Sequence, residues 1–238
     1  MSGRAVKVEI YSDIACPWCY VGKTRFERAL SVFPGGRDVE VVYRPFQLDP
    51  AAPREARGHR EVLAAKFGPR AVAMDERITR LGAAEGITFD FGTVLENNSL
   101  LAHRLLRFAL EEYGAEAQTR LKGRLMAAHF GEGMDIGDPA QLTAAALAAG
   151  LDPAAATAFL AGDRLTDEVL AEIDEARRLG ITAVPTFVFE GQWAVQGGQE
   201  TSTFLRVLEQ VAKETAEVAA EDTAGACADG ACEVVPNA

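Results

Sequence analysis

The segment Cys16-Pro17-Trp18-Cys19 constrains the fold more than any other feature, because it stands between a predicted strand and a predicted helix. Before it, residues 6–11 (VKVEIY) alternate β-branched and aromatic residues with polar ones, which is the pattern of a strand. After it, apolar side chains recur at helical spacing as far as Leu30, and proline is favoured in the first turn of a helix. The sequence therefore predicts that Cys16 lies at the N-terminus of a helix that follows a buried strand.

The rest of the chain predicts an α/β protein with a long helical segment between two parts of one sheet. Residues 39–43 (VEVVY) read as a second strand, and a strand–helix–strand unit of this length has a parallel strand pair as its default. From residue 53 to residue 162, apolar residues at helical spacing, broken at glycines and prolines, indicate helices throughout. Strand patterns return at 186–189 and 193–195, joined by a short hairpin-like connection, and a closing helix is expected over 203–215.

These patterns divide the chain into three parts. Residues 1–52 and 166–213 form a discontinuous α/β domain, and residues 53–165 form a helical insertion. Residues 214–238 form a C-terminal tail with six acidic residues and no basic one. Because the tail has few large apolar side chains, we expect a loosely held extension.

Charge and hydropathy exclude several classes of function. The 238 residues carry a net charge of −11, which would repel a nucleic-acid backbone. No stretch reaches the roughly 18 apolar residues of a membrane span, and the N-terminus lacks the apolar core of a secretory signal. We therefore expect a cytoplasmic protein that binds neither nucleic acid nor membrane. In a reducing compartment, two close cysteine pairs suggest redox or metal chemistry rather than structural disulfides.

The first cysteine pair fits redox chemistry at a helix N-terminus. Unpaired backbone N–H groups and the helix dipole favour a thiolate there, so the sequence predicts a lowered pKa for Cys16. Cys16 would attack a disulfide, and Cys19, one turn into the helix and more buried, would resolve the mixed disulfide. Pro17 restrains the loop, and an exposed Trp18 beside the sulfur suggests contact with substrate. The alternatives are half of a zinc site or two unrelated buried thiols.

A second signal is Val184-Pro185 directly before the strand at 186–189. In this topology the loop faces the active-site helix, and a cis Pro185 would turn the backbone of Val184 outward to pair with an extended substrate. An ordinary trans proline at the start of a strand is the alternative. Only the combination with the cysteine pair favours substrate docking.

Cys227 and Cys232 form the second pair, with turn residues Asp229-Gly230 between them. One hypothesis is an auxiliary redox pair on a mobile tail, able to exchange with Cys16 and Cys19 or with substrate. The other is a reactive tail without function, and a zinc site built from all four cysteines is a further alternative.

Other polar candidates give weaker signals. Asp13 either caps the helix, the favoured interpretation, or accepts a proton from the active site through water. His103 is interpreted as a structural histidine. His59 and His129 have no second ligand at a metal spacing, so we expect no metal and no cofactor.

Taken together, YSDIACPWCYVGK, ITAVPTFVF and the helical insertion resemble the DsbA family of the thioredoxin superfamily, and most closely its FrnE-like branch. ENNSLLAHRLLRFA, EGMDIGDPAQL and FEGQWAVQGGQ are typical of that branch, and the likeness runs from Val6 to Gln210. The resemblance implies a thioredoxin-like fold with an inserted helical domain and thiol–disulfide oxidoreductase or disulfide isomerase activity on protein disulfides. It implies that Cys16 is the nucleophile, Cys19 the resolving cysteine and Pro185 a cis proline. FrnE-like proteins also carry a C-terminal C-x4-C, matched by Cys227 and Cys232.

One departure affects the expected redox potential. Periplasmic DsbA proteins usually have a histidine where Trp18 stands, so we expect a milder potential here, suited to reduction or isomerisation. The thioredoxin system or glutathione would supply electrons, and a homodimer would suit an isomerase. The alternative functions are a redox-independent chaperone or peptide-binding module, and a glutathione-dependent isomerase or transferase of the kappa-related group. That group usually carries serine where Cys16 stands.

Overall fold

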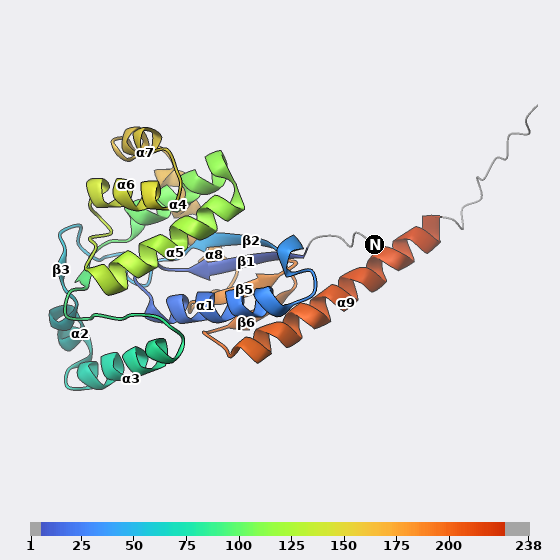
Figure 1. The fold of residues 1–238 in the computed structure, drawn as a ribbon. Coiled ribbons are helices and arrows are strands. Elements are labelled where there is room, and N and C mark those ends of the chain that lie inside the picture. Colours follow the sequence, from blue (N-terminus) through green and yellow to red (C-terminus); the bar gives the residue numbers. More distant parts are fainter. Residues whose placement is uncertain (1–5, 227–238) are drawn as a thin grey trace, which may run out of the picture.

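A four-stranded sheet with the strand order β2-β1-β5-β6 forms the centre of the structure, a computed structural model that describes residues 6–226 (Figure 1). In chain order the elements are β1 (Lys7–Ser12), α1 (Pro17–Val32), a 3-10 turn (Gly36–Asp38), β2 (Glu40–Pro45), β3 (Arg57–Gly58), α2 (His59–Phe67), α3 (Arg70–Ala84), β4 (Leu95–Glu96), α4 (Leu100–Tyr113), α5 (Ala115–Glu132), α6 (Pro139–Ala148), α7 (Pro153–Leu160), α8 (Thr166–Arg178), β5 (Thr186–Phe189), β6 (Trp193–Gln196) and α9 (Thr201–Ala226).

The strand pairing follows the sequence prediction. β1 and β2 run parallel, with Ile10 opposite Tyr43. β5 runs antiparallel to β1, with Phe187 opposite Ile10, and β6 pairs antiparallel with β5. The predicted strand–helix–strand unit and the closing hairpin are therefore confirmed. The sheet brings the end of β1, which leads to Cys16, beside the start of β5, which follows Pro185.

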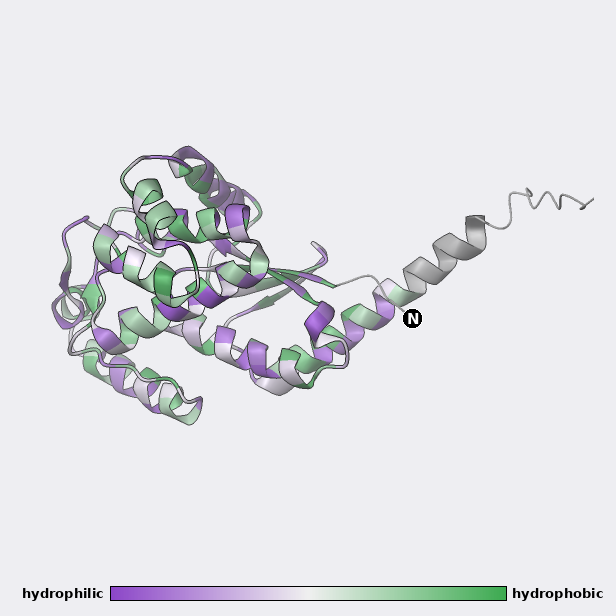
Figure 2. Ribbon diagram, turned by 45° about the horizontal axis from the view of Figure 1, so that its top comes forward, coloured by the Kyte–Doolittle hydropathy of each residue, from purple (hydrophilic) through white to green (hydrophobic). Residues whose placement is uncertain are grey.

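Helices cover both faces of the sheet. α1 and α9 lie on one face, where the rings of Phe26, Phe187, Phe189 and Phe204 pack with centroid separations of 4.5–6.1 Å. On the other face, Ala176 of α8 packs in a second apolar cluster. In Figure 2 most helices carry a hydrophobic and a hydrophilic side, as amphipathic helices do. The fold is thus α/β with helices in layers around one sheet.

The insertion between β2 and α8 has two parts. α4 to α7 share a core that includes Leu105, Leu121 and Leu142. α2 and α3 form a helical pair beside a small sheet, in which β3 pairs antiparallel with β4. The prediction of helices throughout residues 53–162 is wrong at these two strands, because strands of two residues are too short to show an alternating pattern.

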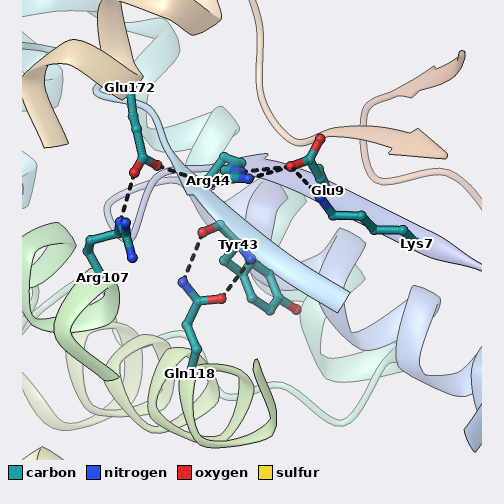
Figure 3. Close-up of polar contacts among 7 residues, drawn as sticks. All are labelled: Lys7, Glu9, Tyr43, Arg44, Arg107, Gln118 and Glu172. Carbon is teal, nitrogen blue, oxygen red and sulfur yellow. Dashed lines mark hydrogen bonds and ion pairs between the residues drawn. The ribbon is translucent and has the colours of Figure 1, made fainter. Parts of the chain in front are cut away.

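A glutamine joins the insertion to the edge of the central sheet. Gln118 of α5 accepts a hydrogen bond from the backbone N–H of Tyr43 at 2.8 Å and donates one to its carbonyl oxygen at 2.9 Å (Figure 3). Beside it, Arg44 of β2 contacts Glu9 at 2.6 Å, and Glu172 of α8 accepts from Arg107 of α4 at 2.8 Å. The amide thus occupies backbone groups that an edge strand would otherwise expose, and it fixes α5 against β2.

α9 is longer than predicted. The expected helix covered residues 203–215, but α9 continues to Ala226, so the first part of the segment 214–238 is helical. Within residues 6–226, no helix combines the length and apolarity that crossing a membrane requires.

Candidate active site

Cys16 and Cys19 lie where the sequence places them, at the start of α1. Cys16 is the N-cap residue and Pro17 occupies the first turn, as predicted. The backbone N–H of Cys19 donates to the carbonyl oxygen of Cys16 at 3.0 Å. Both thiols are free, and both side chains are buried, with 4% of Cys16 and 2% of Cys19 exposed. The two sulfurs are therefore enclosed by protein on most sides.

The loop before β5 lies against Cys16. The Cys16 thiol donates to the carbonyl oxygen of Val184 at 3.7 Å, and the Val184–Pro185 peptide bond is cis. Gly22 makes this approach possible, since a Cβ atom there would lie 2.9 Å from Pro185 Cγ. The structure thus brings Cys16 together with Val184 and Pro185, which lie about 170 residues further along the chain.

A cavity of about 400 Å³ opens onto Cys16. Pro17, Trp18 and Val184 line it from the central domain, and α2, α3 and the segment around β4 form the opposite wall. The wall from the insertion combines apolar side chains with charged ones. The apolar ones include Leu63, Phe67, Met74, Ile78 and Phe91, and the charged ones include Arg57, Lys66, Asp75 and Glu96. Trp18 is half-buried, with the guanidinium of Arg77 5.8 Å from its ring centroid. Cys19 does not line the cavity, so only Cys16 presents its sulfur side to this space.

The pKa values of the pair differ from the sequence prediction. Hydrogen bonding with Cys19 and burial raise the pKa of Cys16 well above its ordinary value, and the charges of Cys19 and Asp13 act in the same direction. Burial also raises the pKa of Cys19, but the Cys16 thiol, the Lys122 ammonium and the Ser12 hydroxyl outweigh it and lower this pKa. The prediction of a lowered pKa for Cys16 is therefore wrong for the free dithiol.

Asp13 lies beside the pair but does not cap α1. Its carboxylate accepts from the backbone N–H of Leu48 at 2.8 Å and of Ala15 at 3.4 Å, and the N-cap position belongs to Cys16. The favoured capping interpretation is therefore wrong, because α1 begins one turn too late for Asp13 to reach its first N–H groups. His103 Nε2 lies 3.2 Å from Asp13 Oδ1. Burial raises the pKa of Asp13, but the contacts with His103 and Leu48 outweigh it and lower it.

Two residues near the site were not predicted from the sequence, since Lys122 gave no distinctive signal and His59 was considered only as a metal ligand. Lys122 of α5 is fully buried, and its charge acts on Cys19. Its only signal in the sequence was a lysine on the helix face that also carries Leu125, Met126 and His129. His59, the first residue of α2, lines the cavity. No spacing in the sequence links either residue with Cys16.

His59 is held between two carboxylates. Its Nδ1 lies 2.6 Å from Glu96 and its Nε2 2.9 Å from Asp75, while its ring stacks on Phe91 at 4.6 Å. Burial lowers the pKa of His59, but the two carboxylates outweigh this effect and raise it above its ordinary value. The imidazolium thus ties α2 to α3 and β4, the elements that wall the cavity.

The structure does not test the second cysteine pair. Cys227 and Cys232 lie outside the described residues. Across residues 6–226, no group of three histidine, cysteine or acidic side chains is arranged to hold a metal ion.

The fold and the site together define a thioredoxin-like protein whose sheet is interrupted by a helical insertion and whose dithiol begins the first helix. The chain belongs to the family of DSBA-like thioredoxin domains, whose model matches residues 7–209. The DsbA-family proteins that it resembles are thiol–disulfide oxidoreductases.

Individual relatives agree with this assignment. The probable DsbA oxidoreductase SCO1869 from Streptomyces coelicolor is 37% identical, with a TM-score of 0.79 over 87% of this chain and 89% of that chain. The uncharacterized protein YwbO from Bacillus subtilis is 31% identical over 85% of this chain and 96% of its own length. The cytosolic disulfide reductase DsbM from Pseudomonas aeruginosa shares the fold at 20% identity, with a TM-score of 0.59 over 86% of this chain and 97% of that chain.

Proposed function

We propose that this protein is a cytoplasmic thiol–disulfide oxidoreductase that exchanges electrons with protein disulfides through Cys16 and Cys19. The observation that carries the proposal is the unequal access of the two sulfurs. Cys16 lines the cavity, whereas Cys19 lies behind it. A nucleophile must reach the substrate, and a resolving cysteine must reach only the nucleophile.

The reaction follows from this arrangement. Cys16 loses its proton to solvent, and its thiolate attacks one sulfur of the substrate disulfide. The other substrate sulfur leaves as a thiolate, and a mixed disulfide with Cys16 remains. Cys19 then passes its proton to the substrate thiolate that has left and attacks the Cys16 sulfur, which releases the second substrate thiolate. The substrate gains two electrons, and the pair loses two as it forms its own disulfide.

Substrate docking uses the surroundings of Cys16. The backbone at Val184 and Pro185 would pair with an extended segment of the substrate, and Pro17 and Trp18 would contact the residues beside its disulfide. The position of Val184, whose carbonyl oxygen lies 3.7 Å from the Cys16 sulfur, supports this role. The same site serves reduction and isomerisation, depending on whether the mixed disulfide is resolved by Cys19 or by another thiol of the substrate.

Two partners complete the cycle. A thiol reductant, the thioredoxin system or glutathione, would return the pair to its free form. Cys227 and Cys232 would act as an auxiliary redox pair that exchanges with Cys16 and Cys19. If so, replacing both by serine slows turnover with a protein substrate but leaves the first attack by Cys16 unchanged.

Insulin reduction and reactivation of scrambled ribonuclease, measured side by side, test the proposal. We expect activity in at least one assay for the wild type and for Cys227→Ser/Cys232→Ser, and none for Cys16→Ser. The ratio of the two activities reports a preference for reduction or isomerisation. Wild-type protein that is folded but inactive in both assays would contradict the proposal. Suppression of aggregation by a Cys16→Ser/Cys19→Ser variant would then favour a chaperone.

A further inference from the structure

The helix α2, which walls the cavity beside Cys16, is attached in an unusual way. Among the nine residues of α2, only His59 is buried. The apolar side chains Val62, Leu63 and Phe67 line the cavity instead, and Phe67 is 41% exposed. A surface helix normally buries an apolar face against a core. The attachment of α2 therefore depends on an imidazole and not on an apolar core.

Two carboxylates from other elements hold this imidazole. Nδ1 of His59 lies 2.6 Å from Oε1 of Glu96 in β4, and Nε2 lies 2.9 Å from Oδ1 of Asp75 in α3. The ring also stacks on Phe91, with its centroid at 4.6 Å. All four side chains line the cavity that opens onto Cys16. We call His59, Asp75 and Glu96 the histidine clamp, since they join α2 to α3 and β4.

The geometry of the clamp requires a protonated imidazole. A carboxylate can only accept a hydrogen bond, and a neutral imidazole has one N–H group and one lone pair. Neutral His59 could therefore donate to Asp75 or to Glu96 but not to both, and its lone pair would face the other carboxylate. Only the imidazolium donates to both, through charge-assisted hydrogen bonds that are stronger than neutral ones. Deprotonation of His59 thus removes one arm of the clamp.

Other titratable and charged groups surround the clamp without replacing either arm. They are His129 of α5, whose charge would act on His59, and three groups that line the same cavity, namely Arg57 of β3, Lys66 of α2 and Asp13 before α1. Burial lowers the pKa of His129, so this ring adds no competing charge at neutral pH. Burial also lowers the pKa of His59, but Glu96 and Asp75 outweigh this effect and raise it. The clamp therefore opens above the ordinary histidine pKa of about 6.5.

We propose that the histidine clamp positions α2 as the wall against which substrate docks and that it releases this wall when His59 deprotonates. The inference rests on the proposed function and adds a regulation of the same site by pH. His59 is a positioning residue, because it acts through Val62, Leu63 and Phe67. While the clamp is closed, these side chains face the cavity in a fixed arrangement. When one arm is lost, α2 loosens and substrate docks less well at Cys16.

Glu96→Gln separates the clamp from its charge. The amide of glutamine can donate to Nδ1 of a neutral imidazole while Nε2–H donates to Asp75, so both arms persist without an imidazolium. This variant should hold α2 in place at every pH. Glu61→Gln is the matched control, because it makes the same change on α2 at an exposed residue that does not line the cavity. His59→Gln should loosen α2 even at low pH.

Amide hydrogen exchange of the reduced full-length protein measures the attachment of α2 directly. Protection of residues 59–67 is compared at pH 6 and pH 9, after correction for the chemical exchange rate, with α4 as the internal reference. We expect protection of α2 relative to α4 to fall about tenfold or more in the wild type, the effect of losing one hydrogen bond to a charged group. Glu61→Gln should show the same fall, and Glu96→Gln should show almost none.

Substrate docking is then measured as KM for the reduction of scrambled ribonuclease at the same pH values. Only the fraction of molecules with a closed clamp docks substrate well, so KM should rise by about threefold to tenfold from pH 6 to pH 9 in the wild type and in Glu61→Gln. In Glu96→Gln the rise should be smaller than about twofold. Titration of Cys16 changes kcat in every one of these proteins, so KM is the quantity that reports the clamp.

The proposal is overturned if α2 of the wild type keeps its protection relative to α4 between pH 6 and pH 9, or if Glu96→Gln loses it equally. It is also overturned if protection falls with pH but KM does not rise. The wild-type comparison decides even where a variant fails to fold. Hydrogen exchange needs no turnover, so a wild type that is inactive towards disulfides but shows the pH-dependent protection of α2 would contradict the proposed function and leave the clamp standing.

Discussion

Gly22 of α1 lies so close to the ring of Pro185 that a Cβ atom at Gly22 would be 2.9 Å from Pro185 Cγ. The same Cβ atom would lie 3.3 Å from the Cα of Gly198, which has no side chain to move aside. This contact sets the distance between the active-site helix and the loop that carries Val184. A glycine inside a helix is normally unfavourable, so its presence here reflects packing.

Gly22→Ala should therefore destabilise the protein by about 1–3 kcal/mol, because either α1 or the loop must shift. The shift should also lower the rate of disulfide reduction, since it moves Val184 relative to Cys16. Urea unfolding and insulin reduction measure the two effects. Gly123→Ala is the control, because its new Cβ would meet only the flexible end of Lys23, and alanine is favoured in a helix. Equal stability of both variants would contradict this account.

His59→Gln should destabilise the protein in a pH-dependent way. The pKa of His59 is raised in the folded protein, so its contribution to stability is complete below about pH 6.5 and is lost as the pH rises through the folded pKa. We expect a loss of about 1–3 kcal/mol at pH 6 and a smaller loss at pH 9. Urea unfolding at both pH values checks this.

His129→Gln provides the opposite case. Burial lowers the pKa of His129, so this histidine loses its contribution as the pH falls below its ordinary pKa. The difference between wild type and His129→Gln should therefore shrink at low pH. If the destabilisation caused by His59→Gln also became smaller at low pH, His59 would not be held as an imidazolium.

Lys122→Met should stabilise the reduced protein at pH 7. The pKa of Lys122 falls to about 8 in the folded state, below the ordinary lysine value, so the charged side chain destabilises the fold at every pH below about 8. This penalty, of the order of 3 kcal/mol, shrinks as the pH rises from about 8 to about 10.5. The advantage of the apolar variant should shrink over the same range. Thermal or urea unfolding measures both stabilities, and a Lys122→Met variant less stable than the wild type at pH 7 would contradict this prediction.

The redox potential should be more reducing than that of DsbA. Trp18 supplies no positive charge, and the pKa of Cys16 is raised rather than lowered, so the reduced pair lacks the stabilised nucleophilic thiolate of a strong oxidant. Equilibration with dithiothreitol or glutathione should give a value between roughly −270 and −180 mV. A potential near about −120 mV, the value for DsbA, would refute the expectation.

Local patterns predicted the sheet and the residues that surround the Cys16 sulfur. The strands around Ile10, Tyr43 and Phe187 show alternation or apolar runs, and the motif at Cys16 follows the first of them. Pro185 became informative only in combination with the cysteines, and the two meet because β1 and β5 are neighbours in the sheet. The strands can be predicted from short-range periodicity, and the rules for connecting strands leave only a few topologies for them.

The remaining features depend on tertiary contacts that no local pattern encodes. Asp13 has the spacing of a cap, but the structure uses its carboxylate for Leu48 and His103. Lys122 reads as an ordinary helical lysine until Gln118 fixes the orientation of α5. The pKa of Cys16 likewise depends on its hydrogen bond with Cys19 and on its burial, which only the folded chain supplies. Burial and tertiary contacts therefore decide the electrostatics of the site.

Trapping the mixed disulfide tests the central claim, that Cys16 attacks and Cys19 resolves. Cys19→Ser, in the Cys227→Ser/Cys232→Ser background, is incubated with a disulfide-bonded protein and analysed by mass spectrometry after alkylation. We predict a stable one-to-one adduct joined through Cys16, absent from the matched Cys16→Ser variant and short-lived when both cysteines are present. An adduct that forms on Cys19 when Cys16 is replaced, or no adduct on Cys16 when Cys19 is replaced, would contradict the assignment.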